Sequence, residues 1–142
     1  MSSLLRVLVI NGNRLLLNGI SAFVQAQPGL VLIGRSDTAD AGLGLFKATD
    51  PDVTLIDIDL PDESGIQAIT FIRAVSSTAW VIALAGCEAN ERAVQAFAAG
   101  ACTVLPKDLI QTLLLPLLTA GRPPTGSLYA PPMLMELSAE AG

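Results

Sequence analysis

An aspartate that ends an apolar run is the clearest candidate for chemistry in this sequence. The residues from Val53 to Ile56 are apolar or β-branched, Asp57 follows them, and Pro61 and Gly65 come at short offsets after the aspartate. A buried parallel strand delivers an acid in this way to the carboxyl edge of its sheet, where open α/β folds keep their active sites. We therefore predict that Asp57 lies in such a site.

The ends of the neighbouring strands decide what surrounds this aspartate. In a doubly wound sheet the site forms where the first and third strands part, so residues that follow several strands converge there. The predicted pocket takes its residues from the ends of strands one, three, four and five: Asn11, Gly12, Asp57, Asp59, Ala85 and Lys107.

Strand and helix signals alternate along the chain as far as residue 121. Apolar runs predict strands at 6–10, 30–33, 53–57, 80–84 and 101–105. Helical spacing predicts helices at 15–24, after Thr38 or Asp40, after Ser64, from Asn90 to Gly100, and at 109–120. Five strands alternating with five helices predict an α/β fold, a flavodoxin-like doubly wound parallel sheet with strand order 2-1-3-4-5.

The composition bounds the domain organisation and excludes several classes of protein. The 142 residues have room for one domain, at 1–121, and a proline-rich linker or tail at 122–142. A net charge of −5 argues against nucleic-acid binding by this segment, and the absence of histidine removes the commonest general base and zinc ligand. No apolar stretch reaches the roughly 20 residues of a membrane span, so we expect a cytoplasmic protein. Cys87 and Cys102 are expected to be reduced, small apolar residues.

Residues 5–120 resemble the receiver domains of response regulators, which have a CheY-like fold. The resemblance rests on Asp57, the turn from Leu60-Pro61 to Gly65, the Gly100-Ala101 step, and Lys107. It implies that Asp57 occupies the position to which a histidine kinase transfers a phosphoryl group. The segment from Gly126 to Leu134 resembles the linker that precedes a LuxR-type helix-turn-helix domain in NarL-type regulators. The resemblance thus implies that DNA binding belongs to a further C-terminal domain.

The sequence departs from the receiver pattern where phosphoryl transfer needs it most. Receivers hold Mg²⁺ with an acidic pair after strand one, and here Asn11 and Gly12 replace that pair. Magnesium prefers carboxylate oxygens, so we predict weak or absent Mg²⁺ binding and no cofactor. The family's switch residues, a Ser or Thr and an aromatic residue, are replaced by Ala85 and Val104. Neither can relay phosphorylation by a hydrogen bond or a moving ring.

Two residues near Asp57 have more than one interpretation. Asp59 is the obvious substitute metal ligand, but the family uses the backbone carbonyl at this position, so we expect its side chain to point outward. Lys107 either reaches toward a phosphorylated Asp57 or forms a structural ion pair with the unmodified carboxylate. Without Mg²⁺ the structural pair is favoured.

These observations favour a regulatory, non-enzymatic role. The first hypothesis is an atypical receiver domain that acts by dimerisation or interaction, largely without Mg²⁺-dependent phosphorylation. The alternatives are a conventional receiver phosphorylated on Asp57 and a pseudo-receiver that senses a small molecule. An unrelated flavodoxin-like enzyme is disfavoured, because no glycine-rich phosphate loop or nucleophile–base pair is visible.

The last helix carries more leucines than one buried face requires. We predict a homodimer through the face formed by the predicted elements at 90–100, 101–105 and 109–120, with Leu109, Leu115 and Leu118 at the interface. The alternative is that the C-terminal tail covers the same surface. Pro116 is expected to bend or shorten this helix.

Overall fold

A five-stranded sheet with helices on both faces makes up the described part of the chain. The computed structural model describes residues 4–60, 64–86 and 90–122, so Pro61, Cys87 and the tail from 123 to 142 lie outside the described residues. The strands are β1 (Leu5–Ile10), β2 (Leu30–Ser36), β3 (Val53–Asp57), β4 (Val81–Ala85) and β5 (Thr103–Pro106). The helices are α1 (Arg14–Gln25), α2 (Ala39–Thr49), α3 (Gly65–Val75), α4 (Asn90–Ala99) and α5 (Ile110–Ala120), with a 3-10 turn at Lys107–Leu109 before α5.

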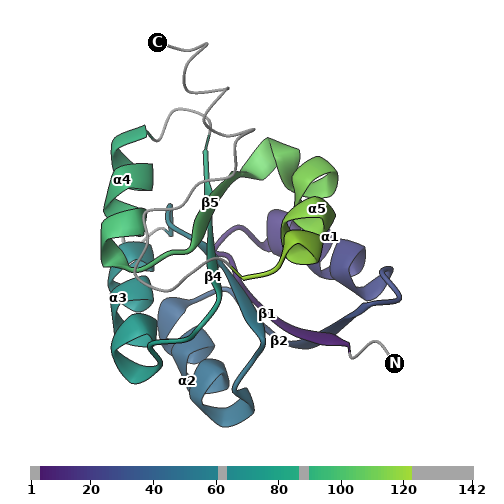
Figure 1. The fold of residues 1–142 in the computed structure, drawn as a ribbon, viewed down its shortest axis with the longest axis horizontal. Coiled ribbons are helices and arrows are strands. Elements are labelled where there is room, and N and C mark those ends of the chain that lie inside the picture. Colours follow the sequence, from purple (N-terminus) through teal and green to yellow (C-terminus); the bar gives the residue numbers. More distant parts are fainter. Residues whose placement is uncertain (1–3, 61–63, 87–89, 123–142) are drawn as a thin grey trace.

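The strands are parallel and lie in the order β2-β1-β3-β4-β5, which confirms the predicted topology. Helices α1 and α5 cover one face of the sheet, and α2, α3 and α4 cover the other (Figure 1). This arrangement follows from right-handed crossovers between parallel strands. The chain moves in one direction across the sheet from β1 to β2 and in the opposite direction afterwards, so α1 lies on one face and α2, α3 and α4 lie on the other.

The sheet is buried on both faces, so the core forms two hydrophobic clusters. Alternate residues of one strand enter different clusters because side chains alternate across a strand. Thus Val7 and Val9 pack under α1 and α5, while Leu8 and Ile10 pack under α2, α3 and α4. All five residues of β3 are buried, the polar Thr54 included, and Asp57 ends the strand at the carboxyl edge of the sheet.

Polar caps begin two of the helices. Asn13 Oδ1 accepts a hydrogen bond from the Leu16 amide at 3.1 Å and caps α1. Thr38 Oγ1 accepts one from the Ala41 amide at 3.2 Å, so Thr38 rather than Asp40 caps α2. Such side chains satisfy amides that have no partner inside the helix.

Helix α5 continues through Pro116 to Ala120, so Pro116 does not shorten it, and the alternative that it bends the helix stays a prediction. Proline has no amide hydrogen to donate to the carbonyl four residues earlier, which belongs to Thr112. Both residues are exposed, and water can therefore take the place of the lost hydrogen bond. None of the described helices, α5 included, is long and apolar enough to cross a membrane.

Candidate functional site at the carboxyl edge

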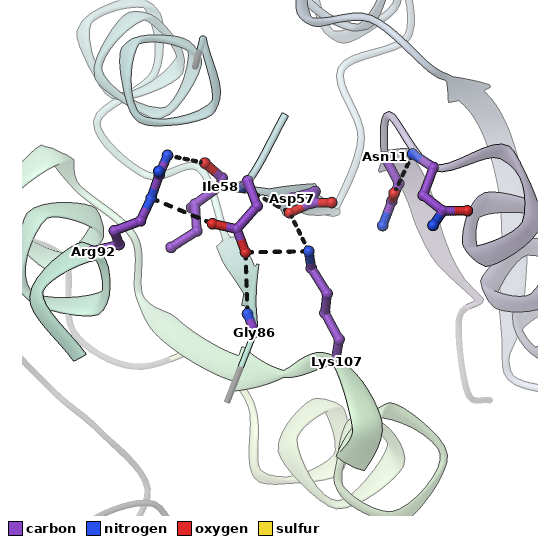
Figure 2. Close-up of polar contacts among 8 residues, drawn as sticks. Asn11, Asp57, Ile58, Gly86, Arg92 and Lys107 are labelled. Atoms are coloured by element: carbon purple, nitrogen blue, oxygen red, sulfur yellow. Dashed lines mark hydrogen bonds and ion pairs between the residues drawn. The ribbon is translucent and has the colours of Figure 1, made fainter. Parts of the chain in front are cut away.

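The ends of β1 and β3 bring Asn11 and Asp57 together. Ile10 pairs with Ile56 across these strands, so the next residue of each strand leaves the sheet beside the other. Both residues are buried: the Asp57 side chain is 3% exposed and Asn11 is 0% exposed. In Figure 2, Asp57 lies between Asn11 on one side and Arg92 on the other. The structure thus assembles the predicted pair at the edge where β1 and β3 part.

The Asp57 carboxylate is held by groups of the chain itself. Its Oδ1 accepts a hydrogen bond from the backbone amide of Asp59 at 2.7 Å. The same oxygen lies 3.0 Å from Lys107 Nζ, which reaches it from the end of β5 (Figure 2). A buried carboxylate requires such a positive partner, because removing a lone anion from water is costly. The predicted pairing of Lys107 with Asp57 is therefore present in the structure.

The Asp59 side chain also belongs to this cluster, so the expectation that it points outward is wrong. Its Oδ2 accepts hydrogen bonds from Lys107 Nζ and from the Gly86 amide, each at 3.2 Å. Lys107 therefore bridges the two carboxylates. The physical reason is charge: an ammonium group between two aspartates attracts both, and a neighbouring amide satisfies a further lone pair.

Arg92 on α4 is a member of the site that sequence reasoning missed. Its Nη2 donates a hydrogen bond to the Ile58 carbonyl at 2.7 Å. Its Nε lies 3.3 Å from Asp59 Oδ1, an ion pair by distance, although no hydrogen bond aligns with that buried Nε. The available signal was its place in the first turn of the helix after β4, at the same edge of the sheet. We call Asn11, Asp57, Asp59, Arg92 and Lys107 the Asp57 site.

The Asp57 site balances its own charge. Two carboxylates face two cations, Lys107 and Arg92, so a metal ion is not needed to neutralise the aspartates. A receiver fold implies a Mg²⁺ ion at this edge, but the residues present fit it poorly. Both carboxylates already have cationic partners, and β1 offers an amide instead of an acid. In the described part of the chain no three His, Cys, Asp or Glu side chains group into a metal-binding cluster.

Asn11 has one satisfied and one unsatisfied end. Its Oδ1 accepts a hydrogen bond from the Asn13 amide at 2.9 Å, which fixes the orientation of the side-chain amide. Its Nδ2 is buried and has no hydrogen-bond partner among the described residues. Buried polar groups are nearly always paired, so this donor is an exception in the core of the site. The adjoining Gly12 contributes no side chain and is half-buried.

The two switch positions hold small apolar side chains. Ala85 ends β4 and Val104 lies in β5, and both are buried in the cluster beneath α2, α3 and α4. Ala85 has no hydroxyl group that could bind a phosphoryl oxygen. Val104 has no ring that could move between the core and the surface. Neither side chain therefore offers the hydrogen bond or the moving ring through which receivers relay phosphorylation.

Gly65 fixes the turn that follows Asp57. A Cβ at this position would lie 2.5 Å from the Asp57 carbonyl oxygen and 2.7 Å from Ile58 Cα. Both are backbone atoms, so no side-chain rotation can relieve the contact. Helix α3 therefore begins against the exit of β3 because residue 65 has no side chain.

The predicted interface residues on the last helix are less exposed than the sequence suggested. Leu118 is only 7% exposed and packs in the core under α1 and α5, so its assignment to a dimer interface is wrong. Leu115 is half-buried and packs against the same cluster, and Leu109 is also half-buried. The reason is that the buried face of α5 is wide: Ile110, Leu114, Leu117 and Leu118 are buried, and Leu113 and Leu115 pack beside them. The dimer itself stays a prediction.

The fold and the Asp57 site place the chain in one class of flavodoxin-like domains. These domains have acidic residues at the carboxyl edge of the sheet and a lysine after the fifth strand. The family model of the response regulator receiver domain matches residues 7–118. The chain belongs to this family.

The chain is similar to transcriptional response regulators and to their solved receiver domains. It is 24% identical over 103 residues to the nitrate/nitrite response regulator protein NarL of Escherichia coli, covering 72% of this chain and 48% of that protein. It is 30% identical over 104 residues to the transcriptional regulatory protein LiaR of Bacillus subtilis, covering 73% and 49%. The signal receiver domain of the putative response regulator NarL from Mycobacterium tuberculosis has a TM-score of 0.76 at 27% identity, covering 84% and 99%. The chain spans about half the length of these curated relatives.

Proposed function

We propose that this chain is an atypical receiver domain of a NarL/LuxR-type transcriptional regulator, one that acts by interaction without Mg²⁺-dependent phosphorylation. The observation that carries the proposal is the buried Asn11 at the end of β1, where receivers place an acidic pair, beside an Asp57 that is already paired with Lys107 Nζ at 3.0 Å. Phosphoryl transfer to a carboxylate brings two anions together and relies on a metal ion for charge neutralisation. Here β1 contributes no acid to hold such an ion, and Asp57 and Asp59 already have Lys107 as a partner.

The lack of residues that could relay a change from the Asp57 site to the surface supports the same proposal. A ligand shifts a conformational equilibrium only as far as its contacts differ between the two states. Ala85 and Val104 offer no such contacts. The domain therefore keeps one arrangement of its α4–β5–α5 face, and its partners recognise that arrangement directly.

A magnesium and beryllofluoride titration tests this function. We expect no saturable change in Trp80 fluorescence or in amide shifts of the site at millimolar Mg²⁺, because every carboxylate of the site has a cationic partner. Trp80 is buried immediately before β4 and reports on the packing under α1 and α5. Sub-millimolar Mg²⁺ affinity of the unmodified chain would overturn the proposal.

The matched control for this titration is the double variant Asn11→Asp/Gly12→Asp. It adds carboxylates next to Asp57 and should gain Mg²⁺ affinity, because two or more acidic oxygens make a usable magnesium site. A gain in this variant shows that the assay detects binding at this edge.

Conventional phosphotransfer is the second candidate function. It is favoured by the pairing of Asp57 with Lys107, since a lysine at that distance would also contact a phosphoryl group on Asp57. In that case a phosphoryl donor with Mg²⁺ should label the chain, and Asp57→Asn should abolish the label. A histidine kinase would then be the natural partner.

We also propose a homodimer through the α4–β5–α5 face, in a cytoplasmic protein whose DNA contacts lie outside residues 1–121. The net charge of −5 supports the last point, because phosphate contacts require clustered lysine and arginine. On α4, Val94 is 68% exposed, and an exposed apolar side chain of this size is consistent with a contact surface.

Sedimentation at tens of micromolar tests the dimer. We expect the unmodified chain to sediment as a dimer and Val94→Glu to sediment as a monomer, because a charge at the interface would be desolvated. The matched control is Val75→Glu on α3, which is 53% exposed but lies away from the proposed face and should leave the dimer intact. A monomer for the unmodified chain would refute the interface.

A further inference from the structure

The dipeptide Asn11-Gly12 has a chemistry that the receiver function does not use. We propose that Asn11 is a site of spontaneous deamidation in the native fold, which converts the amide at the carboxyl end of β1 into a carboxylate. The product is aspartate or isoaspartate at position 11, directly beside Asp57. The proposal adds a covalent modification site, and its effect on the Asp57 site rests on the proposed function.

The reaction needs only the chain and water. The Gly12 backbone nitrogen loses its proton to a solvent base and attacks Cγ of Asn11, forming a new C–N bond. The bond from Cγ to Nδ2 then breaks, and Nδ2 leaves as ammonia after taking up a proton from water. The resulting five-membered succinimide is opened by water at either carbonyl. Opening at one carbonyl gives aspartate, and opening at the other gives isoaspartate.

The Gly12 nitrogen is available for this attack. Among the described residues its N–H has no hydrogen-bond partner, whereas the Asn11 amide before it donates to the Ser36 carbonyl at 3.0 Å. Residue 12 lies outside any helix or strand and carries no side chain that would shield the approach to Cγ. The nucleophile is therefore free, and the residue that bears the target amide is held in place.

The Asn11 side chain is also arranged for the attack. The Asn13 amide donates to Oδ1 at 2.9 Å, and a donor at this oxygen stabilises the negative charge that develops when nitrogen adds to the carbonyl. The leaving nitrogen, Nδ2, is buried without a partner, so no hydrogen bond retains it in the amide form. The hydrogen bond at Oδ1 thus favours addition of the Gly12 nitrogen to Cγ, and the unpaired Nδ2 is free to leave as ammonia.

The chain contains a matched comparison in Asn18-Gly19. This second Asn-Gly pair lies inside α1, where the Gly19 amide is committed to the helical hydrogen bond with the carbonyl four residues earlier. In addition, the Asn18 Oδ1 accepts a hydrogen bond from Arg35. Asn18 is exposed and Asn11 is buried. Exposure alone would make Asn18 react first, while the availability of the backbone nitrogen makes Asn11 react first.

Deamidation would change the charge of the Asp57 site. A carboxylate at position 11 gives three acidic side chains against the two cations Lys107 and Arg92. The excess anion lies beside Asp57, where a divalent cation would then find two neighbouring acidic residues. The modified chain should therefore bind Mg²⁺ more tightly than the unmodified chain.

Ageing of the native protein tests the modification without any variant. The full chain is incubated at mildly alkaline pH, samples are digested, and the peptides with Asn11 and Asn18 are separated and weighed. We expect the Asn11 peptide to gain the mass difference between NH and O and to split into aspartate and isoaspartate forms, while the Asn18 peptide stays unchanged. In concentrated urea both peptides should convert at similar rates, because the fold no longer distinguishes them. Conversion of Asn18 ahead of Asn11 in the native protein, or conversion of neither, would overturn the proposal.

Variants separate this proposal from the proposed function. Asn11→Gln should lose the conversion at position 11 while keeping an amide there, and continued conversion at that position would contradict the assignment. Asn11→Asp imitates the product for a Mg²⁺ titration. If it binds no more tightly than the unmodified chain, the expected effect on the site is wrong and the modification stands. If the unmodified chain already binds tightly, the proposed function fails and the peptide result is unaffected.

Discussion

Replacing Lys107 with alanine should destabilise the domain by about 2–4 kcal/mol, which is a large part of the stability of a small domain. The ammonium group bridges Asp57 and Asp59, so its loss leaves a nearly buried carboxylate with one backbone amide and a second carboxylate close by. Denaturant unfolding of Lys107→Ala beside the unmodified chain measures the free-energy difference.

Asp57→Asn is the control for this prediction. It removes the buried charge and keeps the shape of the side chain, so it should cost less than Lys107→Ala. The double variant Asp57→Asn/Lys107→Ala should recover part of the stability lost in Lys107→Ala. Greater damage from Asp57→Asn than from Lys107→Ala would contradict the role of Lys107 as the main counter-charge.

Gly65→Ala should destabilise the domain by about 3 kcal/mol or more, at or above the usual range for overpacking. The added Cβ would lie 2.5 Å from the Asp57 carbonyl oxygen, so either the start of α3 or the exit of β3 must move. We expect a lower denaturation midpoint and altered amide shifts for the residues around Asp57. Native-like stability would show that α3 can shift freely away from β3.

Gly44→Ala is the matched control for Gly65→Ala, because it is also a helical glycine. A Cβ at residue 44 would meet nothing within 4 Å. This substitution in α2 should therefore stabilise the domain by about 0.5–1 kcal/mol through helix propensity alone. If Gly44→Ala raises the free energy of unfolding and Gly65→Ala lowers it, the loss at residue 65 comes from the contact of its Cβ with β3.

The convergence of Asn11, Asp57 and Lys107 could be predicted from sequence because it depends on topology. Apolar runs and alternating helices determine the order of the strands, and the order determines which strand ends meet. Backbone positions at the ends of β1, β3 and β5 then follow with little freedom. The loss of the acidic pair was equally visible, since a missing side chain type does not depend on its conformation.

The side chains of Asp59 and Arg92 could not be placed in this way. Asp59 lies in a loop, where either direction of the side chain is compatible with the backbone, and the cations from β5 and α4 decide between them. Arg92 has the sequence pattern of an ordinary surface charge on a helix. Leu118 was misassigned because five of the eleven residues of α5 are leucine, more than one narrow buried stripe requires, and the sequence does not show how wide the buried face is.

The contacts of Arg92 couple the position of α4 to the Asp57 site. The guanidinium group binds the Ile58 carbonyl and lies beside Asp59, so the first turn of α4 is fastened to the loop after β3. A cation that took these oxygens would have to displace the arginine and release the helix. By thermodynamic linkage, a protein partner that prefers the fastened helix must weaken cation binding by the same factor by which the cation weakens the partner. Through the arginine, occupancy of the site and recognition of α4 would each weaken the other.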